Sequence, residues 1–373
     1  AERSPKVRKK KILALDLFTM FMQERSDTGR IYFMNVDHCN THGSFKEEIA
    51  PITMSNLCQE ICLPVVPLQN INDDEGRIAL CSLSAINFGV FKKPEDMEKA
   101  CTLAVRGLDA LLSYQHYPVL AAELHTKEYR PLGVGINNLA YFLAKNDVKY
   151  TDDSALELVD TWAQHWSYYL IKASADLAKD FGPCELNKNT KYSEGILPVD
   201  TYKRSVDKLV KHVDKVDWEG LRKQLKETGI RNATLTALMP SETSSQIINA
   251  TNGVEPPRSF VTKKVSQDGI LTQVVPEFRR LKNKYELLWD QESPRGYLNI
   301  MAILQKYVDQ SISTNISYNP QHYEDELIPM SEMLGDLLYA YSLGLKTGYY
   351  HQTYDGQGEV EIVDESECSS CKI

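Results

Sequence analysis

Apolar residues recur at helical spacing in four long segments of the chain. The first begins with Pro94, which suits the first turn of a helix because that turn leaves its N–H groups unpaired. In another, Asp152 or Asp153 supplies an N-cap, and Gly182-Pro183 ends the pattern. The spacing therefore predicts helices over residues 94–114, 152–181, 297–313 and 330–346.

Short runs rich in β-branched and aromatic residues lie between these helices and predict strands. They cover residues 30–36, 78–83, 234–239, 313–318 and 347–353. Strands that alternate with helices favour an α/β fold in which the strands run parallel.

The composition is ordinary for a globular protein and narrows the possible functions. The 373 residues are 42% hydrophobic, and a net charge of −9 argues against non-specific binding to nucleic acid. No stretch approaches 18 uncharged apolar residues, so a membrane span is excluded. The basic start lacks a cleavage site of small residues, which argues against a signal peptide. A cytoplasmic protein is expected.

The two ends of the chain differ from its middle. Residues 1–17 form a basic lead-in, and residues 355–373 form an acidic tail that is predicted to be flexible. Residues 18–354 form the folded body. Eight cysteines are too few for a disulfide scaffold, so closely spaced pairs point to metal or redox chemistry in a reducing compartment.

A thiol flanked by an amide and a carboxylate lies near residue 58. Asn56, Cys58 and Glu60 are two residues apart, so in an extended segment they share one face. Such a face offers one centre for hydrogen-atom or nucleophilic chemistry and one proton acceptor. An edge strand with a buried cysteine and two solvated polar residues would have the same pattern, and N-x-C-x-E alone is too short to be specific.

A hydroxyl-rich segment after residue 239 suits a phosphate. It would open a helix whose free backbone N–H groups and side-chain hydroxyls can both donate hydrogen bonds. Its residues are Pro240, Ser241, Glu242, Thr243, Ser244 and Ser245. Plain N-capping by Ser241 explains the pattern equally well, because Glu242 would repel a phosphate.

The remaining cysteines and one tyrosine pair have simple interpretations when each is taken alone. Cys81 lies in a β-like run, where a thiol is usually a small core hydrophobe. Tyr349 and Tyr350 are adjacent, and packing explains such a pair in a chain with 20 tyrosines. Cys368 and Cys371 supply two of the four ligands that zinc needs, and a dithiol in a tail is better suited to thiol–disulfide exchange.

The segment 37–42 contains His38 and Cys39 and can be interpreted as part of a metal cluster. Because these two residues are adjacent, their geometry as ligands is poor, and structural polar residues explain the segment better.

Nine motifs occur along the chain in one order. They are residues 28–32, 35–42, 55–60, 79–84, 237–246, 250–253, 255–258 and 346–350 and the terminal Cys371-Lys-Ile. Together they resemble the large (alpha) subunit of aerobic, class I ribonucleotide reductase, and the resemblance runs from about residue 18 to residue 373.

The resemblance implies the C-terminal half of a ten-stranded α/β barrel with a finger loop that carries a radical cysteine. The regulatory region, the first half of the barrel and the first active-site cysteine would belong to an N-terminal half, to which the ATP and deoxynucleotide effectors would bind. Either this chain is an expressed fragment of a longer subunit, or the subunit is naturally encoded as two separate polypeptides. This chain itself would bind no cofactor and no metal. The radical would come from a metal-containing beta subunit.

The resemblance also assigns roles to residues of the segment 55–60, which we call the cysteine loop. Cys58 would become a transient thiyl radical that removes the 3′ hydrogen of a ribonucleoside diphosphate. Glu60 would take the 3′-hydroxyl proton, and Asn56 would hydrogen-bond the sugar. Cys81 would be half of the dithiol that is oxidised in the reaction, and residues 240–245 would bind the substrate diphosphate.

Tyrosines and tail cysteines complete the implied mechanism. Tyr349 and Tyr350 would relay the oxidising equivalent from the beta subunit to Cys58. Cys368 and Cys371 would reduce the active-site disulfide and be re-reduced by thioredoxin or glutaredoxin. Cys62, four residues after Cys58, is not part of the family motif, and we interpret it as structural.

Other functions explain fewer of the residues. The adenosylcobalamin-dependent reductases share the N-x-C-x-E loop, but the tyrosine pair favours the class that is driven by a beta subunit. A cysteine hydrolase that uses Cys58, or an inert or repurposed fragment that binds zinc or a partner, leaves the order of motifs unexplained. Half a barrel exposes strand edges and apolar surface, so the isolated chain is expected to be inactive and prone to aggregate.

Overall fold

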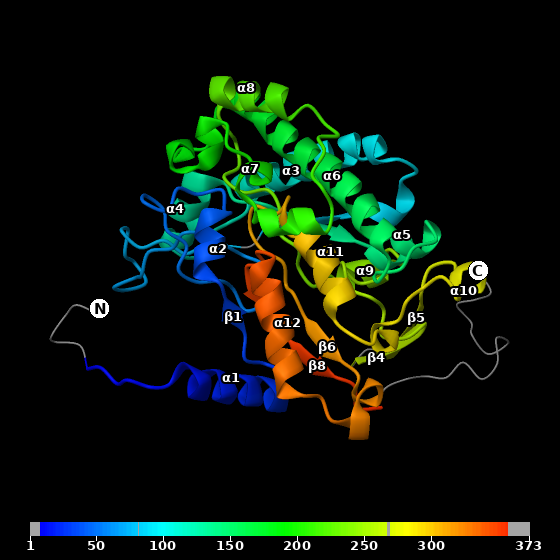
Figure 1. The fold of residues 1–373 in the computed structure, drawn as a ribbon. Helices are drawn as coiled ribbons and strands as arrows, with labels where there is room; N and C mark the ends of the chain where they lie inside the picture. The colour runs from blue at the N-terminus through cyan, green and yellow to red at the C-terminus, as the bar shows by residue number, and fades with distance from the viewer. Residues whose placement is uncertain (1–7, 81, 267–268, 357–373) are drawn as a thin grey trace.

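The computed structural model describes residues 8–80, 82–266 and 269–356 of the chain (Figure 1). The predicted residues Cys81, Cys368 and Cys371 lie outside the described residues. Every helix in the described part is too short or too polar to cross a membrane.

Twelve α-helices are assigned within the described residues. They are α1 (Ala14–Thr28), α2 (Val36–Thr41), α3 (Glu98–Tyr114), α4 (Leu120–Tyr129), α5 (Leu139–Lys145), α6 (Asp153–Phe181), α7 (Pro198–Thr201), α8 (Trp218–Thr228), α9 (Glu242–Ile247), α10 (Phe278–Leu281), α11 (Arg295–Gln305) and α12 (Met330–Ser342). The predicted lead-in 1–17 overlaps with α1, which begins at Ala14.

Eight short strands in the described part of the chain form four pairs. They are β1 (Phe33–Met34), β2 (Leu83–Asn87), β3 (Gly133–Asn137), β4 (Val261–Ser266), β5 (Gly269–Val274), β6 (Ile316–Tyr318), β7 (Thr347–Gly348) and β8 (His351–Thr353). The pairs β2–β3 and β6–β8 are parallel, β1 pairs with β7 antiparallel, and β4 with β5 forms a hairpin.

Single bridges join the two parallel pairs into one row. Val134 bridges Thr236 and Leu238 bridges Ile312, both in parallel. The backbone N–H of Tyr349 also donates to the carbonyl of Thr314 over 2.8 Å. Five parallel segments therefore follow one another in chain order: β2, β3, residues 234–239, the segment that ends in β6, and the segment that ends in β8.

The predicted strands are partly confirmed, with shifts that have physical causes. Residues 234–239 make single bridges on both sides instead of a continuous ladder. The strand predicted at 78–83 is wrong in position, because the ladder with β3 begins only at Leu83. The strand predicted at 30–36 reduces to β1, since α2 starts at Val36 and takes over the end of the apolar run.

The predicted helices are confirmed more closely. Residues 94–97 form a 3₁₀ turn that leads into α3, and α6 begins after Asp152, as the capping pattern predicts. The helices predicted to end at 313 and 346 are too long: α11 ends at Gln305 and α12 ends at Ser342. The residues that follow each helix are apolar because they are buried too, but they are buried in loops and strands and not in a longer helix.

Helix α6 is the centre of the helical layer, between α3, α8 and α11 (Figure 1). Its side chains Trp162 and Trp166 are buried in the main core, which they share with the first four of the parallel segments. The helical layer therefore covers one face of the parallel row, and the cysteine loop packs against the opposite face.

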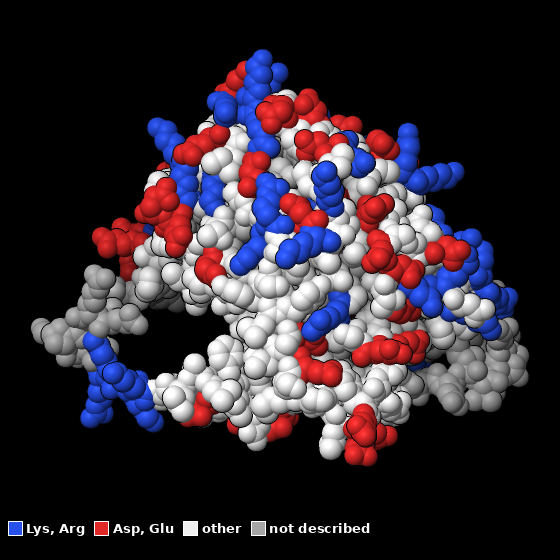
Figure 2. Space-filling model, viewed as in Figure 1, with Lys and Arg blue, Asp and Glu red and all other residues white. Residues whose placement is uncertain are grey.

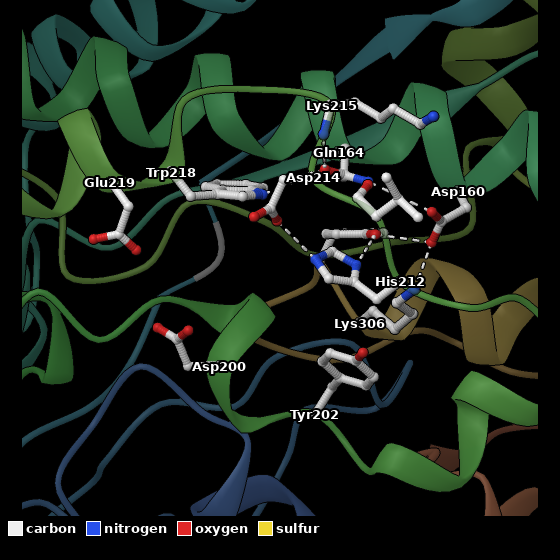
Figure 3. A network of polar contacts seen from close by, with 12 residues as sticks. Asp160, Gln164, Asp200, Tyr202, His212, Asp214, Lys215, Trp218, Glu219 and Lys306 are labelled. Carbon is white, nitrogen blue, oxygen red and sulfur yellow. Dashed lines mark hydrogen bonds and ion pairs between the residues drawn. The ribbon is translucent and has the colours of Figure 1, made fainter.

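A buried polar network ties α6 to the end of α11 (Figure 3). Lys306 Nζ lies 2.6 Å from Asp160 Oδ1, which also accepts a hydrogen bond of 2.8 Å from the Tyr307 hydroxyl. Lys306 further lies over the ring of Tyr202. At the solvent side, His212 Nε2 contacts Asp214 over 3.0 Å.

We expect Asp160→Ala to destabilise the fold by about 3–5 kcal/mol, because it leaves the buried ammonium of Lys306 without its partner. The free energy of unfolding in urea measures this loss. The matched control is Asp214→Ala, whose carboxylate is exposed in the same network. That substitution should change stability by about 0.5 kcal/mol or less. Equal losses in the two variants would contradict the prediction.

Charged residues are distributed unevenly over the face seen in Figure 2. Lysines, arginines and acids alternate over the helices α6, α7 and α8, whereas the surface around α1 and the nearby end of α12 is largely uncharged. Within α1, Leu15 and Met20 are 70% and 61% exposed. Apolar side chains exposed to this degree on one helix are typical of a surface that another polypeptide covers.

Candidate active site

The cysteine loop forms a tight turn and not the predicted extended segment. The N–H of Gln59 donates to the carbonyl of Asn56 over 3.1 Å, and Gln59 adopts a left-handed conformation with φ of 68°. The predicted grouping of the three side chains is nevertheless present. Asn56 hydrogen-bonds to Glu60, and the charge of Glu60 acts on Cys58.

The loop is held by its neighbours in the parallel row. Each of its last three carbonyl oxygens before Ile61 accepts a hydrogen bond from that row. The donors are the Ser313 hydroxyl to Cys58 (2.5 Å), the Thr347 hydroxyl to Gln59 (2.8 Å) and the Ser311 N–H to Glu60 (2.9 Å). Because the contacts are made to backbone, they fix the path of the loop and leave its side chains available.

The carboxyl group of Glu60 is buried next to Ser313. Burial raises the pKa of Glu60, and hydrogen bonds from Asn56 and Ser313 oppose this shift. The Ser313 hydroxyl lies 2.5 Å from the carbonyl of Cys58 and 3.2 Å from Glu60 Oε2, so both oxygens can share its one proton when Glu60 is charged. A protonated Glu60 can instead donate to the Ser313 oxygen while the bond to Cys58 is kept. The site therefore accommodates a carboxyl that gains and loses a proton.

The thiol of Cys58 is in contact with one phenol. Tyr349 donates from its hydroxyl to Cys58 Sγ over 3.6 Å. Burial and the charge of Glu60 raise the pKa of Cys58, and the bond from Tyr349 only partly opposes them. The group is therefore a neutral S–H at physiological pH. Nucleophilic cysteines have a lowered pKa, so this environment favours hydrogen-atom chemistry over a cysteine hydrolase.

Three tyrosine rings, in tilted or edge-on contact, form a continuous cluster that ends at Cys58 and is called the tyrosine stack. The ring centroids of Tyr349 and Tyr350 are 4.0 Å apart, and Tyr32 lies 4.7 Å from the first and 5.4 Å from the second. Hydrogen bonds with Tyr349 and Tyr32 lower the pKa of Tyr350, while burial raises that of Tyr32 to about 12. The rings are close enough for stepwise transfer of an oxidising equivalent.

Arg25 on α1 holds the backbone of the tyrosine pair. Its guanidinium donates to the carbonyls of Tyr349 (2.8 Å) and Tyr350 (3.2 Å) and to that of Ile31. Burial lowers the pKa of Arg25 to about 10, and the side chain is 1% exposed. The position of the stack thus depends on a helix that is more than 300 residues away in the sequence.

The hydroxyl-rich segment opens α9, as predicted. Ser241 stands at the N-cap position, but its side chain makes no capping bond and donates instead to the Met239 carbonyl over 3.4 Å. Plain capping by Ser241 is therefore wrong. Glu242 and Ser245 line a cavity of about 670 Å³ together with His351 of β8.

This segment also lies beside the cysteine loop. The N–H of Leu238 donates to Ser311 over 3.0 Å, and the N–H of Ser313 donates to Leu238 over 2.9 Å. Leu238, two residues before Pro240, is thus paired with the segment that contains Ser313, whose hydroxyl donates to the Cys58 carbonyl. Asn56 of the loop also lines a second cavity of about 520 Å³. Ala79, which is two residues before Cys81 in the sequence, lines the same cavity.

The histidine and cysteine of the segment 37–42 have structural contacts. His38 Nδ1 lies 3.0 Å from the Leu345 carbonyl, and its ring stacks on Tyr341 of α12. Across the residues that the structure describes, no three His, Cys, Asp or Glu side chains gather as metal ligands would.

The parallel row, the thiol loop that it holds and the tyrosine stack lie together on half of an α/β barrel. The family model described as "Ribonucleotide reductase, barrel domain" matches residues 1–351. The chain belongs to this family, as the motifs predict.

Full-length relatives are about twice as long as this chain. It is 53% identical over its whole length to the ribonucleoside-diphosphate reductase subunit alpha of Haemophilus influenzae and covers 50% of that protein. It is 49% identical to subunit alpha of reductase 1 of Escherichia coli, again with coverage of all of this chain and 50% of the relative. The matched part is the C-terminal half.

A solved structure supports the fold. The alpha subunit of the class Id ribonucleotide reductase of Actinobacillus ureae superposes with a TM-score of 0.67 at 23% identity, over 91% of this chain and 61% of that one. At this identity the likeness shows the fold alone, and it confirms the predicted α/β barrel half.

Sequence reasoning missed three residues of the site. Tyr32 lies in a recognised motif, but nothing in the spacing shows that it meets residues 349 and 350. Ser313 and Arg25 carry no local signal, because their roles depend on contacts over 255 and 324 residues. The alternation of Ser311, Ile312 and Ser313 in the sequence gives a hint of Ser313.

Proposed function

We propose that this chain is the catalytic part of the large subunit of a ribonucleoside-diphosphate reductase. It reduces ribonucleoside diphosphates to deoxyribonucleoside diphosphates by a thiyl-radical mechanism. The contact between the Tyr349 hydroxyl and Cys58 Sγ, in a loop that also holds Glu60, carries the proposal. A neutral thiol in contact with a phenol is suited to exchange of a hydrogen atom.

The first step moves an oxidising equivalent along the tyrosine stack. A metal-containing beta subunit supplies it to Tyr350, which passes it to Tyr349. The oxidised Tyr349 takes the hydrogen atom of the Cys58 thiol, so the phenol is restored and a thiyl radical remains on Cys58. The transfer runs along the contact of 3.6 Å.

The second step activates the substrate. The Cys58 thiyl radical takes the 3′ hydrogen atom of the ribose, and Glu60 accepts the proton of the 3′ hydroxyl. Burial raises the pKa of Glu60 towards neutrality, where proton acceptors work most efficiently. Asn56 holds the sugar through its amide. A thiol and a carboxylate positioned by one turn lower the barrier by proximity.

The diphosphate and the reducing equivalents involve other segments. The residues of the segment 240–245 bind the substrate diphosphate, supported by the cavity that Glu242 and Ser245 line. Cys81 and a cysteine of the N-terminal half supply two electrons and become a disulfide. Cys368 and Cys371 reduce this disulfide and are themselves reduced by thioredoxin or glutaredoxin in the cytoplasm.

A separate N-terminal half completes the barrel in this proposal and carries the sites for ATP and deoxynucleotide effectors. The chain spans about half the length of its curated relatives, and α1 exposes Leu15, Leu17 and Met20 at the edge of the molecule (Figure 1). These side chains are the contact surface for the missing half. Without it, the chain is inactive and prone to aggregate.

Formation of deoxynucleotides tests the proposal. The chain is combined with a polypeptide that contains the missing half-barrel and with a beta subunit, with thioredoxin as reductant. Product should form only when all components are present. Product that forms without the beta subunit would refute the radical relay. Hydrolysis of an ester or amide at Cys58 without any reductant would favour the cysteine hydrolase.

We expect Ser313→Ala to lower turnover of the assembled enzyme by up to about tenfold and to move the acid limb of its pH profile to higher pH. The hydroxyl stabilises the charged form of Glu60, so its loss raises the pKa of that carboxyl further. The control is Ser317→Ala on β6, whose hydroxyl bonds to Gln352. An acid limb that stays in place would count against Ser313 as a positioning residue.

A further inference from the structure

Two buried cysteines that the proposed mechanism does not use lie in contact beside the cysteine loop. The thiol of Cys62 donates to Cys39 Sγ over 3.6 Å. Both are free thiols and are almost completely buried. Cys39 is on α2, whereas Cys62 follows Cys58 by four residues on the return segment of the loop.

The surroundings make the two thiols unequal. The hydrogen bond from Cys62 and the nearby ammonium of Lys346 lower the pKa of Cys39, while the same hydrogen bond and burial raise that of Cys62. Lys346 is fully buried and is held by the backbone carbonyls of residues 308–310. The Cys39 sulfur is thus suited to attack an oxidant as a thiolate, while Cys62 keeps its proton, which is the arrangement of many thiol pairs that form disulfides.

We propose that Cys39 and Cys62 form a reversible disulfide in the presence of hydrogen peroxide, and that this bond ties the cysteine loop to α2. The Cys39 thiolate attacks one peroxide oxygen and the O–O bond breaks, which gives a sulfenic acid and, after protonation, water. The Cys62 sulfur then attacks the sulfenic sulfur and displaces hydroxide, which leaves as water with the Cys62 proton. Two thiols and one peroxide give one disulfide and two waters.

The bond changes the position of the loop. A disulfide brings its sulfurs to about 2.05 Å, so these two sulfurs approach each other by roughly 1.5 Å. Helix α2 is fixed, because His38 stacks on Tyr341 and the Tyr341 hydroxyl donates to Asp37 over 2.7 Å. The return segment is held by the bond from the Cys62 N–H to the Gln310 side chain over 3.1 Å, by bonds of Ile61 to Ser55 and Asn56 within the loop itself, and by His125 at the Pro64 carbonyl. Closure of the two sulfurs strains these bonds, and we expect the loop to shift toward α2.

A displaced loop separates Cys58 from Tyr349. A shift of about 1 Å at a reacting centre lowers a rate by about 10²-fold. The disulfide is thus a modification site that switches the enzyme off under oxidation and on again with a dithiol. This effect on turnover rests on the proposed function, but the disulfide itself does not.

Peptide mapping of the full chain tests the chemistry without any activity. The chain is treated with hydrogen peroxide, its free thiols are blocked by alkylation, and the digest is analysed by mass spectrometry with and without dithiothreitol. The expected result is a cross-linked pair of peptides that contain Cys39 and Cys62 and that separate on reduction. Cys39 and Cys62 recovered as alkylated thiols, or a bond between Cys62 and Cys58, would overturn the proposal.

Two variants separate the pair from the other buried thiols. Cys62→Ala removes one partner with little change in volume and should abolish the cross-link. Cys101→Ala is the matched control, because Cys101 is equally buried but lies in the other core cluster, and it should leave the cross-link intact. A Cys39 cross-link that persists in Cys62→Ala would contradict the assignment.

Single turnover in the assembled enzyme tests the consequence. The chain is oxidised, freed of peroxide and combined with its partners without added reductant. The oxidised wild type should be about 10²-fold slower than Cys62→Ala treated in the same way. Equal rates would refute the switch. If both proteins lack activity even before oxidation, the proposed function fails, and the peptide map still decides whether the disulfide forms.

Discussion

Substitution of Cys58 by serine is expected to abolish turnover of the assembled enzyme while substrate still binds. An O–H bond is stronger than an S–H bond, so the oxidised Tyr349 cannot take a hydrogen atom from serine. The loop geometry should survive, because its holding bonds are made to backbone carbonyls. Turnover and equilibrium binding of the nucleoside diphosphate, measured on one preparation, distinguish the two effects.

The control for this substitution is Cys184→Ala. Cys184 is a buried thiol whose pKa is raised to about 12 by burial, and it lies outside the cysteine loop. Its loss should reduce stability slightly and leave turnover per folded molecule unchanged. Substantial turnover by Cys58→Ser would rule out the radical mechanism, whatever the behaviour of the control.

Substitution of Tyr350 by phenylalanine should also abolish turnover, for a different reason. Phenylalanine keeps the ring contact of 4.0 Å with Tyr349 but has no hydroxyl, so the stack loses the group at which the proposed relay begins. Substrate binding and binding of the beta subunit should both be retained. Deoxynucleotide formation measures the first effect, and co-sedimentation with the beta subunit measures the second.

Tyr339→Phe provides the comparison. Tyr339 lies on α12, and its hydroxyl donates to Asn299 over 2.6 Å, outside the stack. Removal of that hydroxyl should leave turnover within about twofold of the wild type, since a single hydrogen bond contributes about 1 kcal/mol or less to the fold. If Tyr350→Phe retains the turnover of Tyr339→Phe, the relay does not pass through residue 350.

The cysteine loop shows how far sequence reasoning reaches. The alternation of Asn56, Cys58 and Glu60 correctly grouped three side chains, although the extended backbone assumed for it is wrong. The turn depends on the left-handed conformation of Gln59, which no local rule assigns to glutamine. A grouping based on spacing can thus survive an error in local conformation when distant contacts restore the proximity.

The strands show the opposite limit. Residues 234–239 have the composition of a strand, yet their backbone hydrogen bonds to each neighbour are too irregular to form more than a single β-bridge. The missed strand β3, Gly133–Asn137, contains two glycines at which a Cβ would collide with Leu83 and Met239. Glycine lowers strand propensity, and the reason for its presence is a close approach that only the folded sheet contains.

The tyrosine stack could be predicted only in part. Tyr349 and Tyr350 are adjacent in the sequence, so their contact could be predicted. Tyr32 meets them only because β1 pairs antiparallel with β7. That contact spans most of the chain and has no signature in either strand of two residues. Long-range pairing of this kind is fixed by the whole fold, and local propensity carries no information about it.

The bonds that hold the cysteine loop also set the order in which the site matures. Ser313 lies 255 residues after Cys58 and Thr347 lies 288 residues after Gln59, so a ribosome exposes the reactive thiol long before its supports are made. Until then only local bonds, such as those from the Gln59 N–H and side-chain amide to the Asn56 carbonyl, support the left-handed conformation of Gln59. Nascent chains therefore carry Cys58 as an ordinary thiol, and the geometry that the proposed radical chemistry requires is complete only when the last two barrel segments pack.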